Sequence, residues 1–386
     1  MENTRNAMNG LWKFFNDPDV QFPDHPTLVP DLHIFQVPHG LGVWLRGGPD
    51  HVLLRGKQIP EIFNFLSRRL DGKSSLHDIL PDCPPHISLQ DLLQTVALLH
   101  TKGLLTNGSP NFGNRHDSRS NADCLERQRI YWGRKVGLTM HAKYGDEIQK
   151  RIERASLAVI PDGLFGLTVC EILARSGFRH IKVIWCGEDE FILDSIASLP
   201  RTTISQCVNR STEELCGITR GVTRTADLAI VAMRNAPTGI LTDLNRIFLD
   251  NQCAAIFSHD DGVEVEVGPF VNPYDTSCYF CAVLRRTSSE DMAVESYLYD
   301  ASLASNAEEE EKNMFGESIA AAAGVASLIA MEAIRVTAKV ATPQLLNSTI
   351  SINPLTGNWK KHRLLRVPRC PECGGGVISH ADVQSR

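Results

Sequence analysis

The sequence lacks the features of exported, membrane-spanning and nucleic-acid-binding proteins. No uncharged apolar run approaches the ~18 residues that a spanning helix needs, and the opening MENTRNAMNG lacks the basic-then-apolar order of a signal peptide. The most apolar late stretch, residues 318–336, contains Glu332 and predicts a buried helix. A net charge of −6 argues against general binding to nucleic acid or to membrane surfaces. We therefore expect a cytoplasmic protein with no nucleic-acid or membrane partner.

The sequence has little sign of a disulfide framework, although it holds 11 cysteines. In a large chain without a secretion signal, cysteines more often bind metal or lie buried as thiols. Seven of them show no ligand spacing, and we expect these to behave as small buried apolar side chains. They are Cys83, Cys124, Cys170, Cys186, Cys207, Cys216 and Cys253.

The other four cysteines form two C-x-x-C pairs, Cys278-Tyr-Phe-Cys281 and Cys370-Pro-Glu-Cys373. Two such pairs can complete the tetrahedral sulfur shell that Zn²⁺ prefers in closed structural sites. The alternatives are a redox pair or chance, but a redox C-x-x-C is expected at a helix start in a thioredoxin-like context. The spacing therefore predicts a structural four-cysteine zinc site with no open position for catalysis.

The length of 386 residues predicts two domains. Residues 1–25 form an N-terminal extension without a clear period. Residues 107–123 are rich in Asn, Ser, Gly and Asp and predict a linker. The linker separates a first domain at 26–106 from a second domain at 124–386.

The first domain shows short strand patterns followed by helical periodicity. In residues 59–72 the apolar side chains recur on one helix face, and Ser88 with Asp91 suggests an N-cap. Three strands and three helices in this space predict a small winged-helix domain. The strands are Leu32–Val37, Gly42–Arg46 and His51–Arg55, and the helices are 59–72, one beginning near Ser74, and Ser88–Lys102.

The second domain alternates strands with helices, which indicates a Rossmann-like, mostly parallel sheet covered on both faces. Residues 157–184 read as strand, turn, helix and strand, and three more strands are predicted at 226–233, 254–257 and 263–267. An intact dinucleotide fingerprint has three glycines, G-x-G-x-x-G. Here only Gly163 and Gly166 are present, and Pro161 takes the first place and removes a backbone donor.

From about 122 to 376 the sequence resembles the ThiF/MoeB superfamily of adenylating enzymes. The resemblance rests on Arg127-Gln128, the glycine loop, the strands before Asn235, Gly268-Pro269 and the two cysteine pairs. It implies a homodimer. The sequence also departs from the family pattern at two positions. Family members hold the ATP ribose with an acidic residue, and this chain has Trp185 at that position. Family members also hold magnesium with an Asp, and this chain has Arg234 at that position.

These departures predict a vestigial nucleotide site and a chain that does not use ATP, although an arginine could still pair with phosphate. The residues of this predicted site are Arg127, Pro161, Gly163, Gly166, Trp185, Arg234 and Asn235.

Residues 26–106 resemble the PqqD-like peptide-recognition element of ribosomal-peptide biosynthesis, above all in HVLLRGKQIPEIFNFLSRRLDGKSSLHDI. In that family a leader peptide adds as a strand beside the third strand and packs on the third helix. The resemblance places the edge at Val52, Leu53, Leu54 and Arg55, and the groove wall at Leu92, Thr95, Val96 and Leu99. Core packing is an equally good interpretation of each leucine.

Together the two resemblances predict a non-catalytic scaffold. It would bind the leader peptide of a ribosomally made precursor and present it to a separate YcaO-type cyclodehydratase for azoline formation. The alternative is an ATP-dependent adenylating enzyme that acts on a peptide or carboxylate, as microcin-type relatives with the same two-domain layout do. Pyrophosphate exchange that depends on substrate distinguishes the two.

Overall fold

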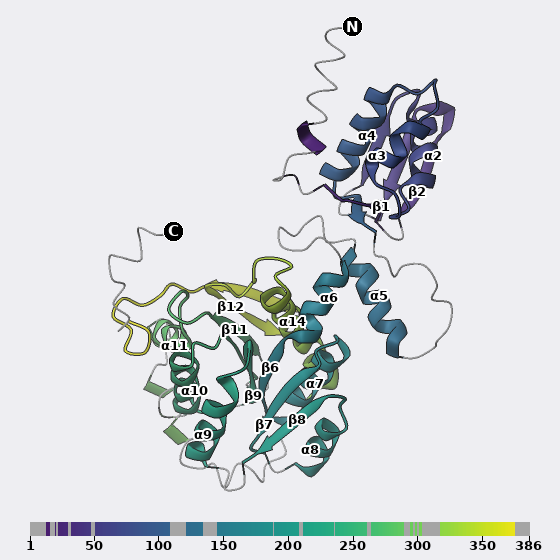
Figure 1. Cartoon of the computed structure of the whole chain (residues 1–386). Helices are drawn as coiled ribbons and strands as arrows, with labels where there is room; N and C mark the ends of the chain where they lie inside the picture. Colours follow the sequence, from purple (N-terminus) through teal and green to yellow (C-terminus); the bar gives the residue numbers. More distant parts are fainter. Residues whose placement is uncertain are drawn as a thin grey trace. The chain divides into compact units, whose positions relative to one another are not determined.

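The computed structural model describes residues 13–15, 20, 22–29, 32–47, 51–108, 121–133, 145–187, 189–207, 211–234, 236–260, 264–288, 294–295, 298, 301–302 and 317–374. The chain divides into two compact units. The first comprises Met1–Arg151 with Ala338–Ala341, and the second Ile152–Thr337 with Thr342–Arg386. Each unit has its own sheets and its own hydrophobic core (Figure 1).

The first unit contains an antiparallel three-stranded sheet in the order β2-β3-β4 and a two-stranded sheet of β1 and β5. The strands are β1 (Pro26–Leu28), β2 (His33–Val37), β3 (Gly42–Arg46), β4 (Val52–Arg55) and β5 (Leu105–Asn107). The α-helices are α2 (Ile59–Arg69), α3 (Leu76–Ile79), α4 (Leu89–Thr101), α5 (Asn121–Gly133) and α6 (Gly145–Arg154), with short 3-10 turns at Pro38–Gly40 and Leu80–Asp82.

The three strands and three helices predicted for residues 32–102 are present. Strands β3 and β4 and the three helices bury apolar side chains in the core of the unit, whereas β2 is exposed at four of its five residues. Helix α2 buries Ile62, Phe63 and Leu66, and a capping box between Ser75 and Asp78 begins α3. The details differ: α2 ends at Arg69, and Ser88 makes no side-chain capping bond at the start of α4. The winged-helix assignment stays a prediction.

The second unit is built on an eight-stranded sheet in the order β13-β12-β11-β10-β9-β6-β7-β8. The five strands from β10 to β8 in this order are parallel, and β11, β12 and β13 join antiparallel. The predicted mostly parallel sheet is thus confirmed. Its strands are β6 (Ser156–Pro161), β7 (His180–Trp185), β8 (Thr202–Gln206), β9 (Leu228–Arg234), β10 (Ala255–Asp260), β11 (Val265–Val271), β12 (Ser348–Asn353) and β13 (Asn358–Arg363).

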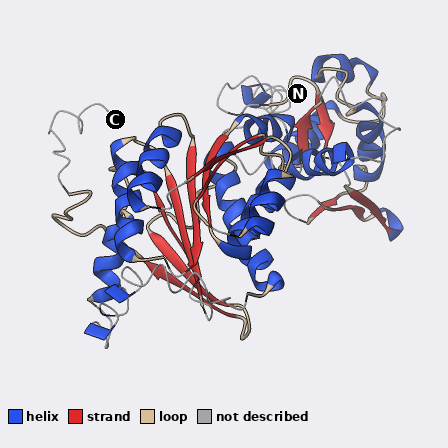
Figure 2. Ribbon diagram, turned by 90° about the horizontal axis from the view of Figure 1, so that it is seen from below, coloured by secondary structure: helices blue, strands red, loops and turns tan. Residues whose placement is uncertain are grey.

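Helices cover both faces of this sheet, with α7 and α8 on one side and α9, α10 and α11 on the other (Figures 1 and 2). The chain runs outward from β6 to β8, returns to β9 and then runs outward to β10, so the strand order reverses between β6 and β9. In open α/β sheets ligands bind outside the carboxyl ends of the strands at such a reversal. The helices are α7 (Gly163–Arg175), α8 (Glu190–Ala197), α9 (Thr212–Thr223), α10 (Thr238–Asp250), α11 (Tyr279–Thr287) and α14 (Ile319–Ala338).

Helix α14 is long and apolar enough to cross a membrane, the single helix of the described ranges for which this holds. The signal is weak, because core helices pass the same test. Glu332 lies in the middle of α14 with 3% of its surface exposed. Its carboxylate accepts the backbone N–H of Gln344 at 2.8 Å and of Leu345 at 3.3 Å, and it pairs with Arg335. These contacts fit the buried helix that the sequence predicts.

Candidate functional site

The carboxyl ends of β6, β9 and β10 bring three charged side chains to the reversal point of the sheet. Asp162 follows β6 directly, Arg234 is the last residue of β9, and Asp260 is the last residue of β10. The register fixes the neighbours, since Pro161 pairs with Ala232 and Asp260 with Arg234. Charged groups are thus gathered where the fold places a ligand.

Helix α7 begins at this point and needs both of its early glycines. Gly163 has φ of +61°, and an added Cβ would lie 2.9 Å from Glu317 Oε1 and 3.1 Å from the Arg234 guanidinium. A Cβ on Gly166 would lie 2.6 Å from the Pro161 side chain. Gly163 therefore provides the turn, and Gly166 the close packing of helix on strand.

The first turn of α7 holds a carboxylate from a distant part of the chain. Glu317 Oε2 accepts the N–H of Leu164 at 3.0 Å, and Oε1 accepts the N–H of Phe165 at 3.0 Å. Arg234 Nη1 lies 3.3 Å from Oε2 of the same carboxylate, whose side chain is 13% exposed. The free N–H groups and the dipole of a helix N-terminus favour an anion. The site thus already binds one negative charge.

Asp162 adds a second carboxylate beside the same arginine. Its Oδ2 accepts the backbone N–H of Arg234 at 3.3 Å and lies 3.8 Å from Arg234 Nε. Burial raises the pKa of Asp162 above its ordinary value, and the nearby Arg234 opposes that shift. The arginine therefore balances two acids, Asp162 and Glu317.

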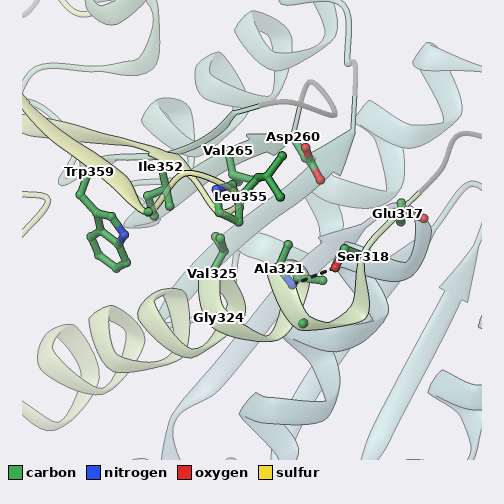
Figure 3. A pocket seen from close by; sticks show the side chains of 14 residues that line it. Asp260, Val265, Glu317, Ser318, Ala321, Gly324, Val325, Ile352, Leu355 and Trp359 are labelled. Atoms are coloured by element: carbon green, nitrogen blue, oxygen red, sulfur yellow. Dashed lines mark hydrogen bonds between the residues drawn. The ribbon is translucent and has the colours of Figure 1, made fainter.

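A cavity of about 500 Å³ opens beside this cluster. Figure 3 shows Glu317 and Asp260 at its polar end and apolar side chains along the rest of its wall. Ser318 Oγ accepts the N–H of Ala321 at 3.4 Å at the start of α14 and fixes one edge. A largely apolar cavity with few polar groups is the usual form of a small-molecule site. The apolar lining includes Val265, Val325, Ile352, Leu355 and Trp359.

The residues of the predicted nucleotide site are only partly brought together. Pro161, Gly163, Gly166 and Arg234 surround the α7 N-terminus. Trp185 ends β7 with 1% of its surface exposed, so its ring is part of the core. The remaining two predicted residues are Arg127, which is exposed on α5 in the first unit, and Asn235, which lies outside the described residues.

Sequence reasoning missed Asp162 and Glu317. Asp162 carried a usable signal, because an acid directly after the first parallel strand lies at the carboxyl edge of the sheet. Glu317 carried none, since 152 positions separate it from Phe165 along the chain.

The prediction for Cys186 and Cys207 is wrong, because they form a disulfide in this structure instead of lying as separate buried thiols. Cys186 follows β7 and Cys207 follows β8, and these strands are parallel neighbours. Adjacent parallel strands bring their ends within bonding reach, which sequence spacing alone does not show.

The four predicted metal ligands meet at one point in the second unit. Their sulfurs all lie within 4.8 Å of one another, and each residue is at most 2% exposed. The Sγ–Sγ distances are 3.8 Å for Cys278–Cys281, 3.8 Å for Cys278–Cys370 and 3.6 Å for Cys281–Cys373. A tetrahedron with Zn–S bonds of about 2.3 Å has edges of about 3.8 Å. The cluster therefore has the donors, size and burial that zinc requires.

The local environment favours the thiolate at one of the four cysteines, Cys281, whereas it raises the pKa of Cys278 and of Cys370 above the ordinary value. A hydrogen bond from the Cys278 thiol is the main cause that lowers the pKa of Cys281 to about 5. The backbone N–H of Val367 also points at the Cys281 sulfur, 3.4 Å away. Metal binding requires deprotonated sulfur, so an ion at this cluster would bind the Cys281 thiolate and displace protons from the other thiols.

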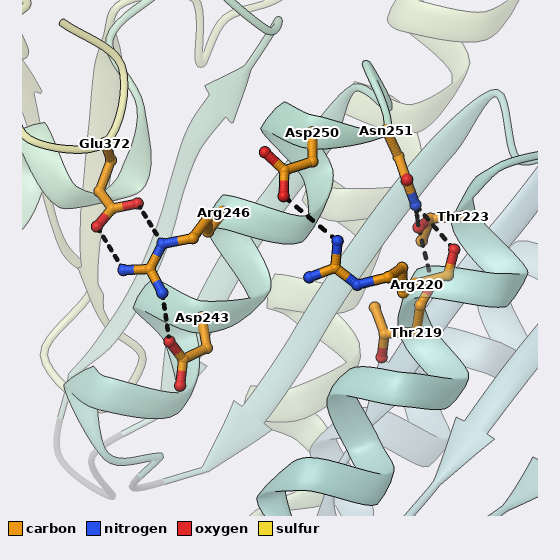
Figure 4. A network of polar contacts seen from close by, with 8 residues as sticks. All are labelled: Thr219, Arg220, Thr223, Asp243, Arg246, Asp250, Asn251 and Glu372. Carbon is orange, nitrogen blue, oxygen red and sulfur yellow. Dashed lines mark hydrogen bonds and ion pairs between the residues drawn. The ribbon is translucent and has the colours of Figure 1, made fainter. Parts of the chain in front are cut away.

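A salt-bridge network fastens the second cysteine pair to helix α10. Glu372, between Cys370 and Cys373, receives two bonds from Arg246: Nε to Oε2 at 3.0 Å and Nη2 to Oε1 at 2.7 Å. Arg246 Nη1 also donates to Asp243 Oδ1 at 3.0 Å (Figure 4). A bidentate arginine–carboxylate pair fixes geometry better than a single contact does.

The predicted peptide-binding residues of the first unit differ in accessibility. On β4, Leu53 and Arg55 are exposed, whereas Val52 and Leu54 face the core. The predicted groove wall is core in this structure: three of its side chains are 0% exposed and the fourth 4%. The physical reason is that this face of α4 packs into the apolar cluster of the unit. The four residues are Leu92, Thr95, Val96 and Leu99.

Comparison with known proteins shows structural likeness only. No family model matches the chain, and no curated protein matches it. Among solved structures, E. coli MccB with ATP has a TM-score of 0.64 at 17% identity, covering 90% of this chain and 99% of that one. The microcin C7 biosynthetic enzyme MccB in complex with N-formylated MccA has a TM-score of 0.65 at 16% sequence identity, with the same coverage of both chains. PaaA has a TM-score of 0.59 at 13% sequence identity, and the match covers 87% of this chain and 99% of that one.

These comparisons support the ThiF/MoeB-type fold and correct two predictions made from the sequence. The prediction of a non-catalytic scaffold is wrong, because the same architecture over 90% of the chain belongs to a biosynthetic enzyme. The prediction that ATP is not used is wrong too, because that enzyme has been solved with ATP and with AMPCPP. The adenylating alternative fits these findings better. Nothing in them supports a YcaO partner.

Proposed function

We propose that this protein is an ATP-dependent enzyme that activates a carboxyl group of a ribosomally made peptide as an acyl adenylate. The observation that carries the proposal is the anion-binding start of α7 at the reversal point of the sheet, where Leu164 and Phe165 N–H groups and Arg234 already hold a carboxylate. The structural likeness to MccB, solved with ATP and with MccA, supports it.

In this reaction a carboxylate oxygen of the peptide attacks the α-phosphorus of ATP. The bond from that phosphorus to the bridging oxygen breaks, and pyrophosphate leaves with the electron pair. The N–H groups of Leu164 and Phe165 would bind phosphate oxygens, as helix N-termini do. Arg234, whose side chain is 20% exposed, would neutralise developing negative charge. It replaces a metal-holding acid of the family with a fixed cation.

The cavity beside the cluster would receive the carboxyl end of the peptide. Its apolar wall suits a side chain, and its polar end at Asp260 and Glu317 lies next to the first turn of α7. Glu317 must leave the N–H groups before a phosphate can take them. ATP binding and loss of the Glu317 contact are therefore coupled in this proposal.

The first unit would recognise the peptide, as its resemblance to PqqD-like winged-helix elements implies. The cysteine cluster would hold one Zn²⁺ through Cys278, Cys281, Cys370 and Cys373, where the ion would stabilise the second unit. Four sulfur ligands leave no open position for substrate, so zinc has no part in the adenylation step.

Titration calorimetry with ATP and with AMPCPP tests the nucleotide part of the proposal. We expect saturable binding of one nucleotide per chain and at least tenfold weaker binding by the Arg234→Ala variant. Arg220→Ala is the matched control, because Arg220 pairs with Asp250 at 3.3 Å, apart from α7 and its anion site. Absence of binding to the wild-type protein at millimolar nucleotide would overturn the proposal.

A further inference from the structure

The three-stranded sheet of the first unit has one open face that carries a row of large apolar side chains. Phe35 lies opposite Trp44, and Trp44 lies opposite Leu53, so one residue from each strand contributes to the row. Their exposed fractions are 54%, 36% and 42%. Directly opposed residues in antiparallel strands are close neighbours, and three strands span about 10 Å. The row is therefore one continuous apolar strip across the sheet.

The strip is bordered by positive charge on both sides. Arg46 lies opposite His33 at one border, and its guanidinium carbon stacks 4.9 Å from the Trp44 ring centroid. His51 lies at the same border, with its ring 6.5 Å from that of Trp44. Arg55, opposite Gly42, provides the other border. Among the described strand residues on this face none is acidic, although the whole chain has a net charge of −6.

We propose that this strip, formed by Phe35, Trp44 and Leu53, docks a peptide segment in which large apolar residues are flanked by aspartate or glutamate. The apolar residues would cover the row, and the carboxylates would pair with Arg46 and Arg55 at its borders. The inference rests on the proposed peptide substrate and names the chemistry of the segment that the first unit recognises.

Charge complementarity favours this occupant over two others. A nucleic acid also stacks on aromatic rings, but each contacted phosphate calls for its own cation, and this face offers two guanidinium groups. A second copy of the chain would place the same cationic borders against each other in a symmetric dimer. A peptide with both apolar and acidic residues can cover the apolar row and can pair its carboxylates with the arginines at the two borders.

Selection from a displayed library of random dodecapeptides on the full-length protein tests the proposal. The library is first depleted on the Trp44→Ser variant. We expect the enriched sequences to combine aromatic or aliphatic residues with adjacent Asp or Glu. The most enriched peptide, synthesised with fluorescein, should bind Trp44→Ser and Phe35→Ser at least tenfold more weakly. The variant Phe191→Ser, which loses a 71% exposed phenylalanine on α8, should bind it like wild type.

Each other result overturns the inference. No enrichment, or enrichment of neutral or basic sequences, removes the acidic peptide as occupant. Tighter binding of a labelled 20-nucleotide RNA assigns the face to nucleic acid, and a shift from dimer to monomer in Trp44→Ser assigns it to a second copy. Thermal melting confirms that each variant is folded. The selection needs no ATP, whereas the proposed adenylation is tested by nucleotide binding and by ATP–pyrophosphate exchange. Failure of this inference is therefore distinguishable from failure of the proposed function.

Discussion

Arg234 and Glu317 form an ion pair at the first turn of α7, with Nη1 3.3 Å from Oε2. The same carboxylate accepts the two N–H groups of Leu164 and Phe165. In Rossmann-type folds the helix N-terminus after the first strand binds the pyrophosphate of a dinucleotide, and here an internal carboxylate occupies the backbone donors at that position. The relationship explains how a loop with Pro161 in place of glycine can still present an anion site.

Removal of Glu317 should strengthen nucleotide binding. The Glu317→Ala variant frees two backbone donors and removes one of the two carboxylates that contact Arg234, so ATP no longer has to displace a carboxylate from the start of α7. Helix-terminus and partly exposed ion-pair contacts are each worth about 0.5–1 kcal/mol, so we expect roughly fivefold tighter ATP binding by calorimetry. Glu190→Ala, which removes a first-turn glutamate from α8, should leave the affinity unchanged. Unchanged or weaker binding by Glu317→Ala would show that the carboxylate helps to hold the nucleotide instead.

Neutralising Asp162 should stabilise the protein at neutral pH. Burial raises the pKa of Asp162 in the folded state above its ordinary value of 3.8. The ionised carboxylate therefore costs stability above the folded-state pKa, and this cost is absent at pH values below 3.8. Asp162→Asn should accordingly raise Tm at pH 7.5, and the gain should disappear towards pH 3.5. A Tm at pH 7.5 equal to or below that of wild type would mean that the Arg234 pair outweighs burial.

Zinc should be present at one ion per chain and depend on the buried cysteines. Elemental analysis of the purified protein should give one Zn, and Cys373→Ser should lose it and lower Tm, because three sulfurs cannot complete the tetrahedral shell. Cys124→Ser, at an exposed cysteine outside the cluster, is the control and should keep the metal. Full zinc content in Cys373→Ser would remove this residue from the ligand set.

The Arg246–Glu372 pair should slow the release of zinc. The bidentate contact fixes the residue between Cys370 and Cys373 against α10, so its loss lets the second cysteine pair open more often. Arg246→Ala should release zinc to a chromogenic chelator several times faster than wild type. Arg220→Ala is the matched control, because it breaks a salt bridge from α9 to α10 that does not involve the cysteine pairs. Equal release rates in the two variants would assign Arg246 a purely local role on α10.

The features that could be predicted from the sequence are those with a local signal. The run Leu228–Val231 is apolar throughout because both faces of its strand are buried. The two C-x-x-C pairs predict that four sulfurs come together, and the structure places these sulfurs within 4.8 Å of one another. Helix α2 follows from its periodic apolar residues alone.

The features that could not be predicted depend on contacts between distant segments. Nothing near Glu317 indicates that its carboxylate caps α7, and nothing near Cys186 indicates its bond to Cys207. The leucines of α4 have the same period in a core as in a groove, and only the structure shows them to be core. The prediction that ATP is not used rested on the backbone donor lost at Pro161 and on the side chains of Trp185 and Arg234, whereas the backbone donors of Leu164 and Phe165 persist.

ATP–pyrophosphate exchange tests the central claim most directly. The zinc-containing protein is incubated with ATP, labelled pyrophosphate and pools of synthetic heptapeptides that end in each of the 20 amino acids with a free carboxyl group. Because adenylate formation is reversible, label should enter ATP in at least one pool, and Arg234→Ala should abolish it. The account is contradicted if the folded, nucleotide-saturated protein puts no label into ATP above the peptide-free background in any pool.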